Sequence, residues 1–431
     1  MTKVDVLLGL QWGDEGKGKI VDVLSGNYDI IARFQGGPNA GHTLEFDGKK
    51  HVLHQIPSGI FHPKTINLIG NGVIIDANIL RKELDALIAR GAKPSENLLI
   101  SKKAHLIIPT HRMLDAAYEN SKGDKKIGST LKGIGPTYTD KIARVGLRIG
   151  DTMDSSFEDK YQSLKDSHLR LLEAYNFDYR TASIDGISLE EYEKLWLTAI
   201  ESIKKEITFV DSEQFINKQL AENKRVLAEG AQGSLLDIDF GSYPFVTSSN
   251  TTTAAVCTGL GISPAKVGKV FGVFKAYCTR VGSGPFPSEL ENAVGQKLRD
   301  NGHEYGSTTG RPRRCGWIDI PALNYAIMLD GVSDLIITKA DVMDNFDELM
   351  ACTSYKIDGV EIDYMPFEIA TKEIIPQLTR VKGWHSDISN IKNYAELPKD
   401  FINYLNYIES LTNLPISIIS TGPDRKQTII R

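Results

Sequence analysis

Short runs of apolar residues alternate along the chain with longer segments in which apolar positions recur every three or four residues. The runs are rich in Val, Ile and Leu and have the length of strands, whereas the longer segments have the spacing of amphipathic helices. This alternation predicts an α/β fold with a large twisted, mostly parallel sheet and flanking helices. The predicted strands are Val4–Leu10, Ile30–Phe34, Asn67–Ile69, Leu98–Ile100, Arg225–Ala228, Lys269–Tyr277, Asp334–Thr338 and Ile416–Ser420.

Helix signals are clearest in two regions. A helix is expected from Asp76 to Arg90, because Asp76 can cap it and a glycine and a proline follow its apolar positions. From about residue 110 to 207 the pattern is mainly helical, and Ser155–Glu158 and Ser188–Glu191 have the spacing of capping boxes. We expect this span to be a helical insertion on the sheet. Since no Pro- or Ser-rich linker marks its ends, residues 1–431 are predicted to form a single domain.

The composition narrows the class of protein. Of the 431 residues, 41% are hydrophobic and 24% are charged, which is typical of a soluble globular protein. The net charge of −5 and the purely local basic clusters argue against a nucleic-acid partner. No apolar run is long enough to span a bilayer and no leader precedes the first predicted strand, so no membrane association is expected. Four scattered cysteines favour reduced thiols and therefore a cytoplasmic protein.

The sharpest chemical signal follows the first predicted strand. From Gly13 the spacing is that of a P-loop, with four intervening residues and then Gly18-Lys19. Glycine-rich turns between a strand and a helix direct backbone N–H groups at phosphate oxygens. The next residue is Ile20, where a P-loop has a magnesium-binding Ser or Thr, so another oxygen ligand must replace that hydroxyl. Asp14 lies inside the loop as a metal ligand, a proton acceptor or both, which indicates phosphoryl transfer.

A second glycine-rich loop, residues 36–43, follows the second predicted strand and contains His42. Its glycines allow the backbone to approach a ligand closely, and a histidine can give or take a proton near neutral pH. Taken alone, this segment would be a tight turn with a hydrogen-bonded histidine. Beside the first loop, a shared phosphate site is the better interpretation.

Two further segments carry specific chemistry. Arg311, Arg313 and Arg314 fall within four positions, and arginine forks suit carboxylates and phosphates; the alternative is a solvated basic turn. Asp341 follows a predicted strand and could accept from N1–H and the 2-amino group of guanine, although a surface Lys–Asp pair is the usual alternative. Segments 133–141, 229–233, 243–253 and 420–425 are rich in glycine, hydroxyls or amides, and none is specific alone.

Together and in this order, these segments resemble the adenylosuccinate synthetases, which join IMP to aspartate at the expense of GTP. The resemblance runs from Gly9 to Arg425. It implies a GTP-dependent carbon–nitrogen ligase of de novo AMP biosynthesis that makes adenylosuccinate, GDP and phosphate through a 6-phosphoryl-IMP intermediate. It also implies Mg²⁺ as cofactor and a homodimer in which Arg144 reaches the partner's IMP site.

The resemblance further implies the residues of each site. The catalytic residues are Asp14 as base, His42 as acid, Lys17 and Gln232, and the magnesium ligands are Asp14 and the Gly41 carbonyl. The GTP site comprises Gly13, Asp14, Glu15, Gly16, Lys17, Gly18, Lys19, Gly41, His42, Thr43, Arg313, Lys339, Ala340, Asp341, Ser420, Thr421 and Gly422. The IMP and L-aspartate sites comprise Asn39, Ala40, Thr130, Arg144, Gln232, Thr247, Ser307, Thr308, Thr309, Gly310, Arg311 and Arg313.

The residues alone do not exclude two other functions. A non-catalytic GTP-binding switch fits the P-loop spacing and Asp341, but it leaves the arginine cluster and the hydroxyl-rich segment without a purpose. Another nucleotide-dependent ligase or kinase with a different carboxylate substrate fits the spacing equally well. Only the family resemblance separates it from the leading interpretation.

Overall fold

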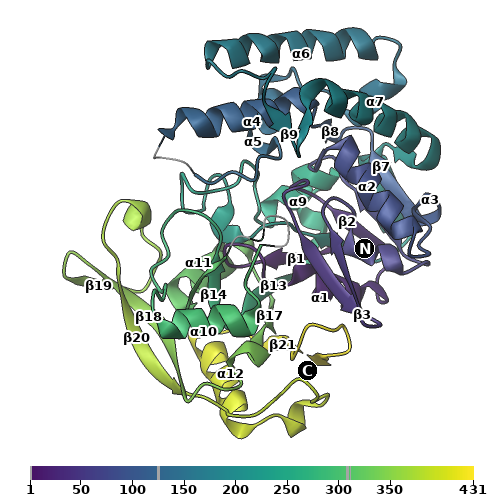
Figure 1. Cartoon of the computed structure of the whole chain (residues 1–431). Coiled ribbons are helices and arrows are strands. Elements are labelled where there is room, and N and C mark those ends of the chain that lie inside the picture. Colours follow the sequence, from purple (N-terminus) through teal and green to yellow (C-terminus); the bar gives the residue numbers. More distant parts are fainter. Residues whose placement is uncertain (1, 124–126, 307–309, 311) are drawn as a thin grey trace.

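The computed structural model describes residues 2–123, 127–306, 310 and 312–431, and a ten-stranded sheet forms its centre (Figure 1). In spatial order the strands are β11 (Thr208–Val210), β7 (Leu98–Ser101), β5 (Ile66–Ile69), β2 (Ile30–Arg33), β12 (Val226–Glu229), β1 (Val4–Gly9), β13 (Val267–Lys275), β17 (Asp334–Thr338), β21 (Ile416–Ser420) and β22 (Thr428–Ile430). All neighbours are parallel except β21 and β22 at one edge. The predicted fold class is confirmed, and each of the predicted strands lies in this sheet.

Helices cover both faces of the sheet, which explains why its strands read as continuous apolar runs. Along β1, Leu7 packs on one face with α1 (Lys17–Ser25), whereas Val6 and Leu8 face the opposite side. Helices on that opposite face are α8 (Ser212–Ala221), α9 (Ala254–Leu260), α11 (Ile320–Asp330) and α12 (Lys399–Thr412). The sheet is therefore a buried layer, and its loops are left to carry the chemistry.

The predicted helical insertion is present beside one edge of the sheet, at the top of Figure 1. Its helices are α4 (Pro109–Ser121), α5 (Ile134–Ala143), α6 (Phe157–Ala174) and α7 (Leu189–Glu206). Helices α4, α6 and α7 share one apolar core with α2 (Ala77–Ile88) and β7, in which Trp196 of α7 is completely buried, whereas Ile134 of α5 packs with Ile74 and Ile107. The insertion and the sheet are thus joined by a common core.

Helix caps test the sequence prediction locally. Asp76 caps α2 as predicted, because its carboxylate accepts hydrogen bonds from the N–H groups of Asn78 and Ile79. Ser188 caps α7 as predicted through the N–H of Glu191. The Ser155 prediction is wrong by one residue: Ser156 precedes α6, and its side chain makes no cap hydrogen bond.

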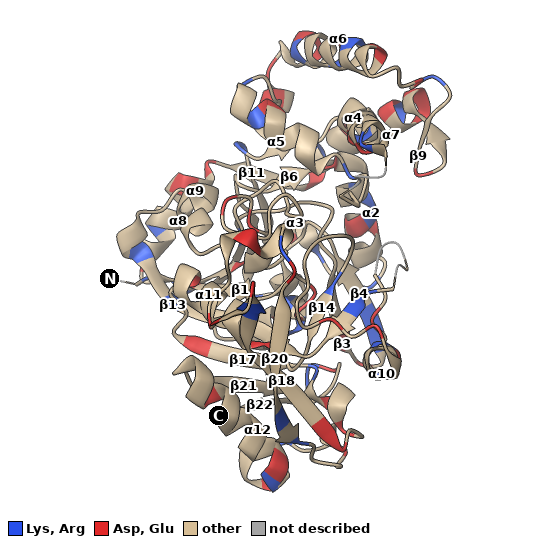
Figure 2. Cartoon of the chain, turned by 90° about the vertical axis from the view of Figure 1, so that its left-hand side faces the viewer, with Lys and Arg blue, Asp and Glu red and all other residues tan. Residues whose placement is uncertain are grey.

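The remaining elements surround this framework. The short helices are α3 (Pro94–Asn97) and α10 (Ala293–Gly302). The smaller sheets pair β3 (His42–Phe46) with β4 (Lys49–Leu53), β6 (Ile74–Ile75) with β8 (His105–Leu106), β9 (Ser183–Ile184) with β10 (Ile187–Ser188), β14 (Cys278–Arg280) with β15 (Arg314–Gly316), and β18 (Glu348–Ile357) with β16 (Ile318–Asp319), β19 (Val360–Ile362) and β20 (Ile375–Lys382). Basic and acidic segments are interspersed over the ribbon in Figure 2. No helix in the described ranges is long and apolar enough to cross a membrane.

Candidate active site

The first loop joins β1 to α1 at the carboxyl end of the central strand. Gly13, Asp14 and Gly16 have positive φ angles of 86°, 62° and 84°, a conformation that glycine adopts without strain. Gly16 directly precedes the first helical residue, Lys17. The strand, the loop and the helix therefore follow one another as the P-loop spacing predicts.

A carboxylate from the loop itself lies among the loop amides. Glu15 is fully buried, and its Oε1 accepts hydrogen bonds from the backbone nitrogens of Gln11 (3.1 Å) and Gly13 (2.8 Å). Its Oε2 pairs with Lys17 Nζ at 2.5 Å. The amides thus converge on an anionic group, as expected of a phosphate-binding loop, but no sequence signal identified Glu15 as that group.

The second loop contacts the first through a close approach of backbone. A Cβ at Gly18 would lie 2.7 Å from the Cβ of His42, so only glycine allows α1 to pack this tightly against the start of β3. His42 Nδ1 lies 2.5 Å from Oε1 of Glu229, which ends β12. Glu229 also accepts hydrogen bonds from Ser58, at 2.8 Å from its N–H and 2.6 Å from its hydroxyl. Glu229 therefore fixes the orientation of the imidazole.

The charge state of this pair follows from its surroundings. Burial, with the nearby Arg33, lowers the pKa of His42 to about 4 despite the opposing carboxylate. Burial alone would raise the pKa of Glu229, but its hydrogen bond with His42 and the charges of His42 and Arg33 lower it overall. At neutral pH a neutral His42 donates its Nδ1–H to ionised Glu229. Its Nε2 then carries a free lone pair, and this buried atom has no partner among the described residues.

The Asp14 carboxylate forms an ion pair with an arginine. Its Oδ2 pairs with Arg313 Nε at 2.7 Å, and the Asp14 side chain keeps 33% exposure. Arg313 Nη1 in turn binds Glu304 at 2.7 Å. One of the three clustered arginines is therefore brought directly onto the loop carboxylate.

Glu304 is the buried end of this ionic chain. Its carboxylate accepts hydrogen bonds from Lys275 Nζ at 2.9 Å and from the hydroxyl of Tyr277 at 2.5 Å. Burial would raise its pKa, but Lys275, Lys339 and Arg313 lower it to about 2. Glu304 is thus ionised and holds Arg313 in place, a contact that no motif indicated.

The arrangement can accommodate a magnesium ion. The carboxylate of Asp14 and the carbonyl oxygen of Gly41 are hard ligands of the kind that Mg²⁺ prefers alongside phosphate oxygens and water. Since the Asp14 carboxylate is one-third exposed, it is accessible to an incoming ion. The donor set therefore fits the metal.

Several predicted residues bury polar atoms that have no partner in the part of the chain described. These atoms are Asn39 Oδ1, His42 Nε2, Gln232 Oε1 and Thr421 Oγ1. A buried polar atom without a hydrogen bond costs free energy, so native proteins rarely retain one except where a ligand, a water or an ion completes it. Each of these four atoms can form a hydrogen bond with a polar ligand or with a water.

Lys19 of α1 contacts the predicted GTP-binding segment at the end of β21. Its Nζ donates to Ser420 Oγ (2.8 Å), to the Gly422 carbonyl (2.6 Å) and to the Gln427 carbonyl (2.8 Å). Burial lowers the pKa of Lys19 to about 8. The structure therefore joins the end of β21 to α1 of the phosphate loop.

The end of β17 contacts the same loop. Thr338 Oγ1 donates to the Glu15 carbonyl at 2.7 Å. Lys339 has a positive φ of 59°, and its Nζ binds the Gly302 carbonyl, whereas burial raises the pKa of Asp341. The short motif is thus adjacent to the phosphate loop.

Other predicted site residues make few contacts with the rest of the site. Thr130 and Arg144 are exposed, and the Arg144 side chain makes no hydrogen bond or ion pair within the described ranges. Thr247 is half-buried, and its N–H donates to the Leu236 carbonyl. Gly310 is exposed with a φ of 64°. The predictions at Ser307, Thr308, Thr309 and Arg311 lie outside the described residues.

This fold and loop arrangement define a nucleotide-dependent α/β enzyme with a P-loop-like phosphate site. A model of the adenylosuccinate synthetase family matches residues 6–429. Adenylosuccinate synthetase of Christiangramia forsetii is 57% identical over 428 residues, covering 99% of this chain and all of the relative, and that of Bacteroides thetaiotaomicron is 56% identical over 429 residues, covering 100% and 99%. The fully ligated Plasmodium falciparum structure superimposes with a TM-score of 0.91 at 40% identity and covers both chains completely. The chain belongs to the adenylosuccinate synthetase family and is a ligase.

Proposed function

We propose that the chain joins IMP to L-aspartate at the expense of GTP and releases adenylosuccinate, GDP and phosphate. The observation that carries this proposal is the set of buried, unpartnered atoms of Asn39, His42, Gln232 and Thr421, all on loops that the family resemblance assigns to ligands. Membership of the family supports the reaction. The contacts described above support the role of each residue.

The chemical difficulty is that the O6 oxygen of hypoxanthine is a poor leaving group. Asp14 removes the N1 proton of IMP, and the resulting charge on O6 allows it to attack the γ-phosphorus of GTP. The bond from the γ-phosphorus to the bridging oxygen breaks, GDP leaves, and 6-phosphoryl-IMP remains. The amine of aspartate then attacks C6, and phosphate departs with O6.

His42 acts as the acid through its Nε2. Glu229 occupies Nδ1, so Nε2 is the nitrogen left for a phosphoryl oxygen. Although burial lowers the pKa of His42, a nearby phosphate anion raises it and allows Nε2 to take up a proton. Lys17 offsets charge on the transferring group, and Gln232 binds the purine side of the site.

The remaining residues bind and orient the substrates. GTP occupies Gly13–Lys19, Gly41–Thr43, Arg313, Lys339–Asp341 and Ser420–Gly422. Magnesium, held by Asp14 and the Gly41 carbonyl, would neutralise phosphate charge during the transfer. IMP contacts Asn39, Ala40, Thr130, Gln232 and Thr247, and aspartate lies on residues 307–313. Holding three substrates together supplies much of the rate.

The protein acts as a homodimer in which Arg144 completes the IMP site of the partner. The exposed Arg144 side chain, which makes no hydrogen bond or ion pair within the described ranges, supports this role. We take residues 1–431 as one domain because the helical insertion shares its core with α2 and β7. The four free cysteines of the chain support a reducing, cytoplasmic setting.

A product assay with single omissions tests the reaction. Adenylosuccinate should form only when GTP, magnesium, IMP and aspartate are all present. Asp14→Asn should reduce turnover by about 10²–10⁴-fold while IMP binding persists in a calorimetric titration. Asp358→Asn, which removes an exposed carboxylate of the β18–β19 turn, is the matched control and should retain wild-type turnover.

Two results would overturn the proposal. Near-normal turnover of Asp14→Asn would remove the base from the mechanism. GTP hydrolysis that ignores IMP and aspartate would favour the GTP-binding switch.

A further inference from the structure

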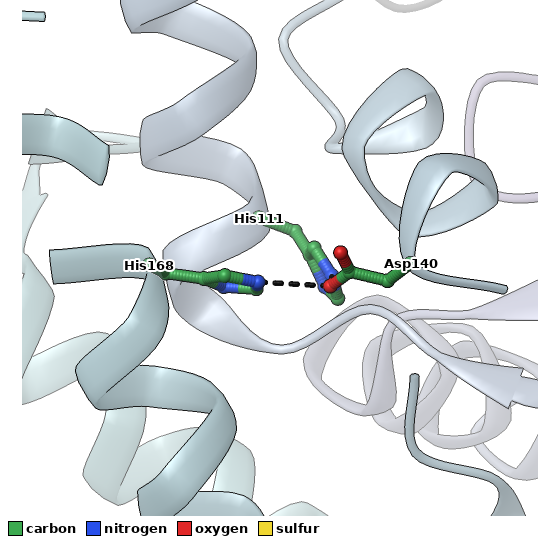
Figure 3. A group of neighbouring side chains, drawn as sticks. All are labelled: His111, Asp140 and His168. Carbon is green, nitrogen blue, oxygen red and sulfur yellow. Dashed lines mark hydrogen bonds and ion pairs between the residues drawn. The ribbon is translucent and has the colours of Figure 1, made fainter. Parts of the chain in front are cut away.

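Two buried histidines and a partly buried aspartate, from three helices of the insertion, meet around one carboxylate oxygen (Figure 3). Asp140 Oδ2 of α5 lies 2.7 Å from Nε2 of His111 on α4 and 2.8 Å from Nε2 of His168 on α6. The two imidazole rings are fully or nearly fully buried, and the Asp140 side chain retains 15% exposure. None of these residues belongs to the proposed substrate sites. The cluster therefore needs its own explanation.

Two histidines and one carboxylate could in principle bind a divalent metal. The hydrogen bonds of His111 argue otherwise. The backbone N–H of Ile108 donates to His111 Nδ1 at 2.9 Å, so Nδ1 carries no proton and the proton of the neutral ring is on Nε2. Metal ligation through Nε2 would require Nδ1–H, which would face the N–H of Ile108. The cluster is therefore built to hold a carboxylate with imidazole N–H groups.

His168 completes this arrangement from the other side. Its Nδ1 lies 2.8 Å from the hydroxyl of Thr110, which can rotate to donate or accept, so Nε2 is free to donate to Asp140. Hydrogen bonds from both histidines lower the pKa of Asp140 in spite of its burial, so the carboxylate is ionised. One anionic oxygen thus ties α4 and α6 to α5.

The main chain of Asp140 shapes the end of α5. Its carbonyl accepts hydrogen bonds from the N–H groups of Arg144, Val145 and Gly146 and so closes the last turn. Arg144 adopts a left-handed conformation with φ of 65° directly after the helix. On either side of it, Ile142 is 77% exposed and Val145 is 55% exposed. The last turn of α5 is therefore fixed by hydrogen bonds, whereas the side chains next to Arg144 are exposed.

We propose that His111 and His168 clamp Asp140 so that the end of α5 presents Arg144 to the IMP site of the partner subunit. Asp140 and the two histidines are positioning residues, because they act through Arg144 without contacting substrate. This inference rests on the proposed function, in which Arg144 serves the neighbouring site. It identifies the groups that hold Arg144 in position.

Kinetics on Asp140→Asn test the clamp. Asparagine keeps the shape but removes the negative charge, so its amide oxygen accepts from the two imidazole N–H groups less strongly. We expect KM for IMP to rise about tenfold, the effect of losing roughly 1.4 kcal/mol of binding, with kcat changed less than threefold. His168→Gln retains a donor and should stay near wild type, whereas His168→Leu should behave like Asp140→Asn. Asp159→Asn, on the exposed face of α6, is the control.

Mixed dimers separate positioning from a structural effect on the mutated chain. Consider a dimer of one Asp140→Asn chain and one Asp14→Asn chain. The site on the Asp140→Asn chain keeps its own Asp14 and receives Arg144 from the partner, whose clamp is intact. We expect that dimer to show half of the wild-type activity with a wild-type KM for IMP. Arg144→Leu mixed with Asp14→Asn tests the underlying shared site in the same way.

The outcomes are distinguishable. Rescue of Arg144→Leu without rescue of Asp140→Asn would overturn the clamp and leave the shared site intact, whereas no rescue of either would overturn both. Mass spectrometry of the protein incubated with zinc should find no stoichiometric metal. Zinc bound to the wild type and absent from His168→Leu would also overturn the clamp. If Asp140→Asn fails to fold, the comparison of His168→Gln with His168→Leu provides the same test.

Discussion

Replacing Glu229 with glutamine probes the buried pair at the centre of the site. The carboxylate of Glu229 accepts three hydrogen bonds, from His42 Nδ1 and from the N–H and hydroxyl of Ser58. Glutamine fills nearly the same volume, but its amide nitrogen is a donor and must face one of these donors. The substitution also removes a negative charge beside Arg33, which is fully buried and has Nε and Nη2 without partners among the described residues.

The expected loss of stability can be bounded. A hydrogen bond to a charged group contributes about 1.5–3 kcal/mol. Because the ionised Glu229 accepts from His42 and Ser58, we expect the free energy of unfolding to fall by about 1.5–3 kcal/mol. Chemical denaturation followed by near-ultraviolet circular dichroism measures this change. Glu291→Gln, at an exposed position, is the control.

The catalytic effect of Glu229→Gln should pass through His42. Without the carboxylate, the imidazole loses its fixed orientation and its preferred tautomer, so kcat should fall by about 10²–10⁴-fold. In a double-mutant cycle, Glu229→Gln should cost little more once His42 has been replaced by asparagine. A Glu229→Gln protein with wild-type stability and turnover would refute the reasoning. Independent, additive losses from the two substitutions would show that Glu229 acts by another route.

Two further predictions concern pH and nucleotide selectivity. Burial lowers the pKa values of His42, His105 and His111 to about 4, below the value of about 6.5 in an unfolded chain. As pH falls, the unfolded state therefore binds more protons than the folded state. The free energy of unfolding should drop by about 1.4 kcal/mol per histidine for each pH unit between 6.5 and 4. A denaturation midpoint that does not change from pH 7 to 5 would contradict this. Asp341→Asn should reduce kcat/KM for GTP by at least about tenfold and change kcat/KM for ATP little, and an unchanged GTP-to-ATP ratio would separate Asp341 from guanine recognition.

Much of the fold was predictable because its strands are buried on both faces. Continuous Val, Ile and Leu runs such as Asp334–Thr338 and Ile416–Ser420 coincide with observed strands. The edge strands β11 and β22 were missed, since each has three residues and only part of each is buried. Ser155 was misassigned because neighbouring serines offer nearly the same capping pattern. Local chemistry therefore located the central strands better than the ends of helices.

The candidate site was predictable only where a motif is contiguous in sequence. The loops around Asp14 and His42 were found from their glycines and their positions after strands. The contacts that orient them were not, because Glu229 is 187 positions from His42 and Glu304 is 29 positions from Lys275. No spacing rule connects residues that meet only when parallel strands align their carboxyl ends. These partners become visible only in three dimensions.

The candidate site buries polar atoms that make no hydrogen bond with the described residues. Leaving a buried donor or acceptor unpaired costs about 1–3 kcal/mol, and Asn39, His42, Gln232 and Thr421 each bury such an atom. The loops that carry them follow strands whose apolar side chains are completely buried, so the sheet offsets this cost. A flexible site could turn these groups toward water and avoid the cost, but it would then have to order them when three substrates bind. Holding these atoms in place in a rigid framework therefore leaves less ordering to be done when the substrates bind.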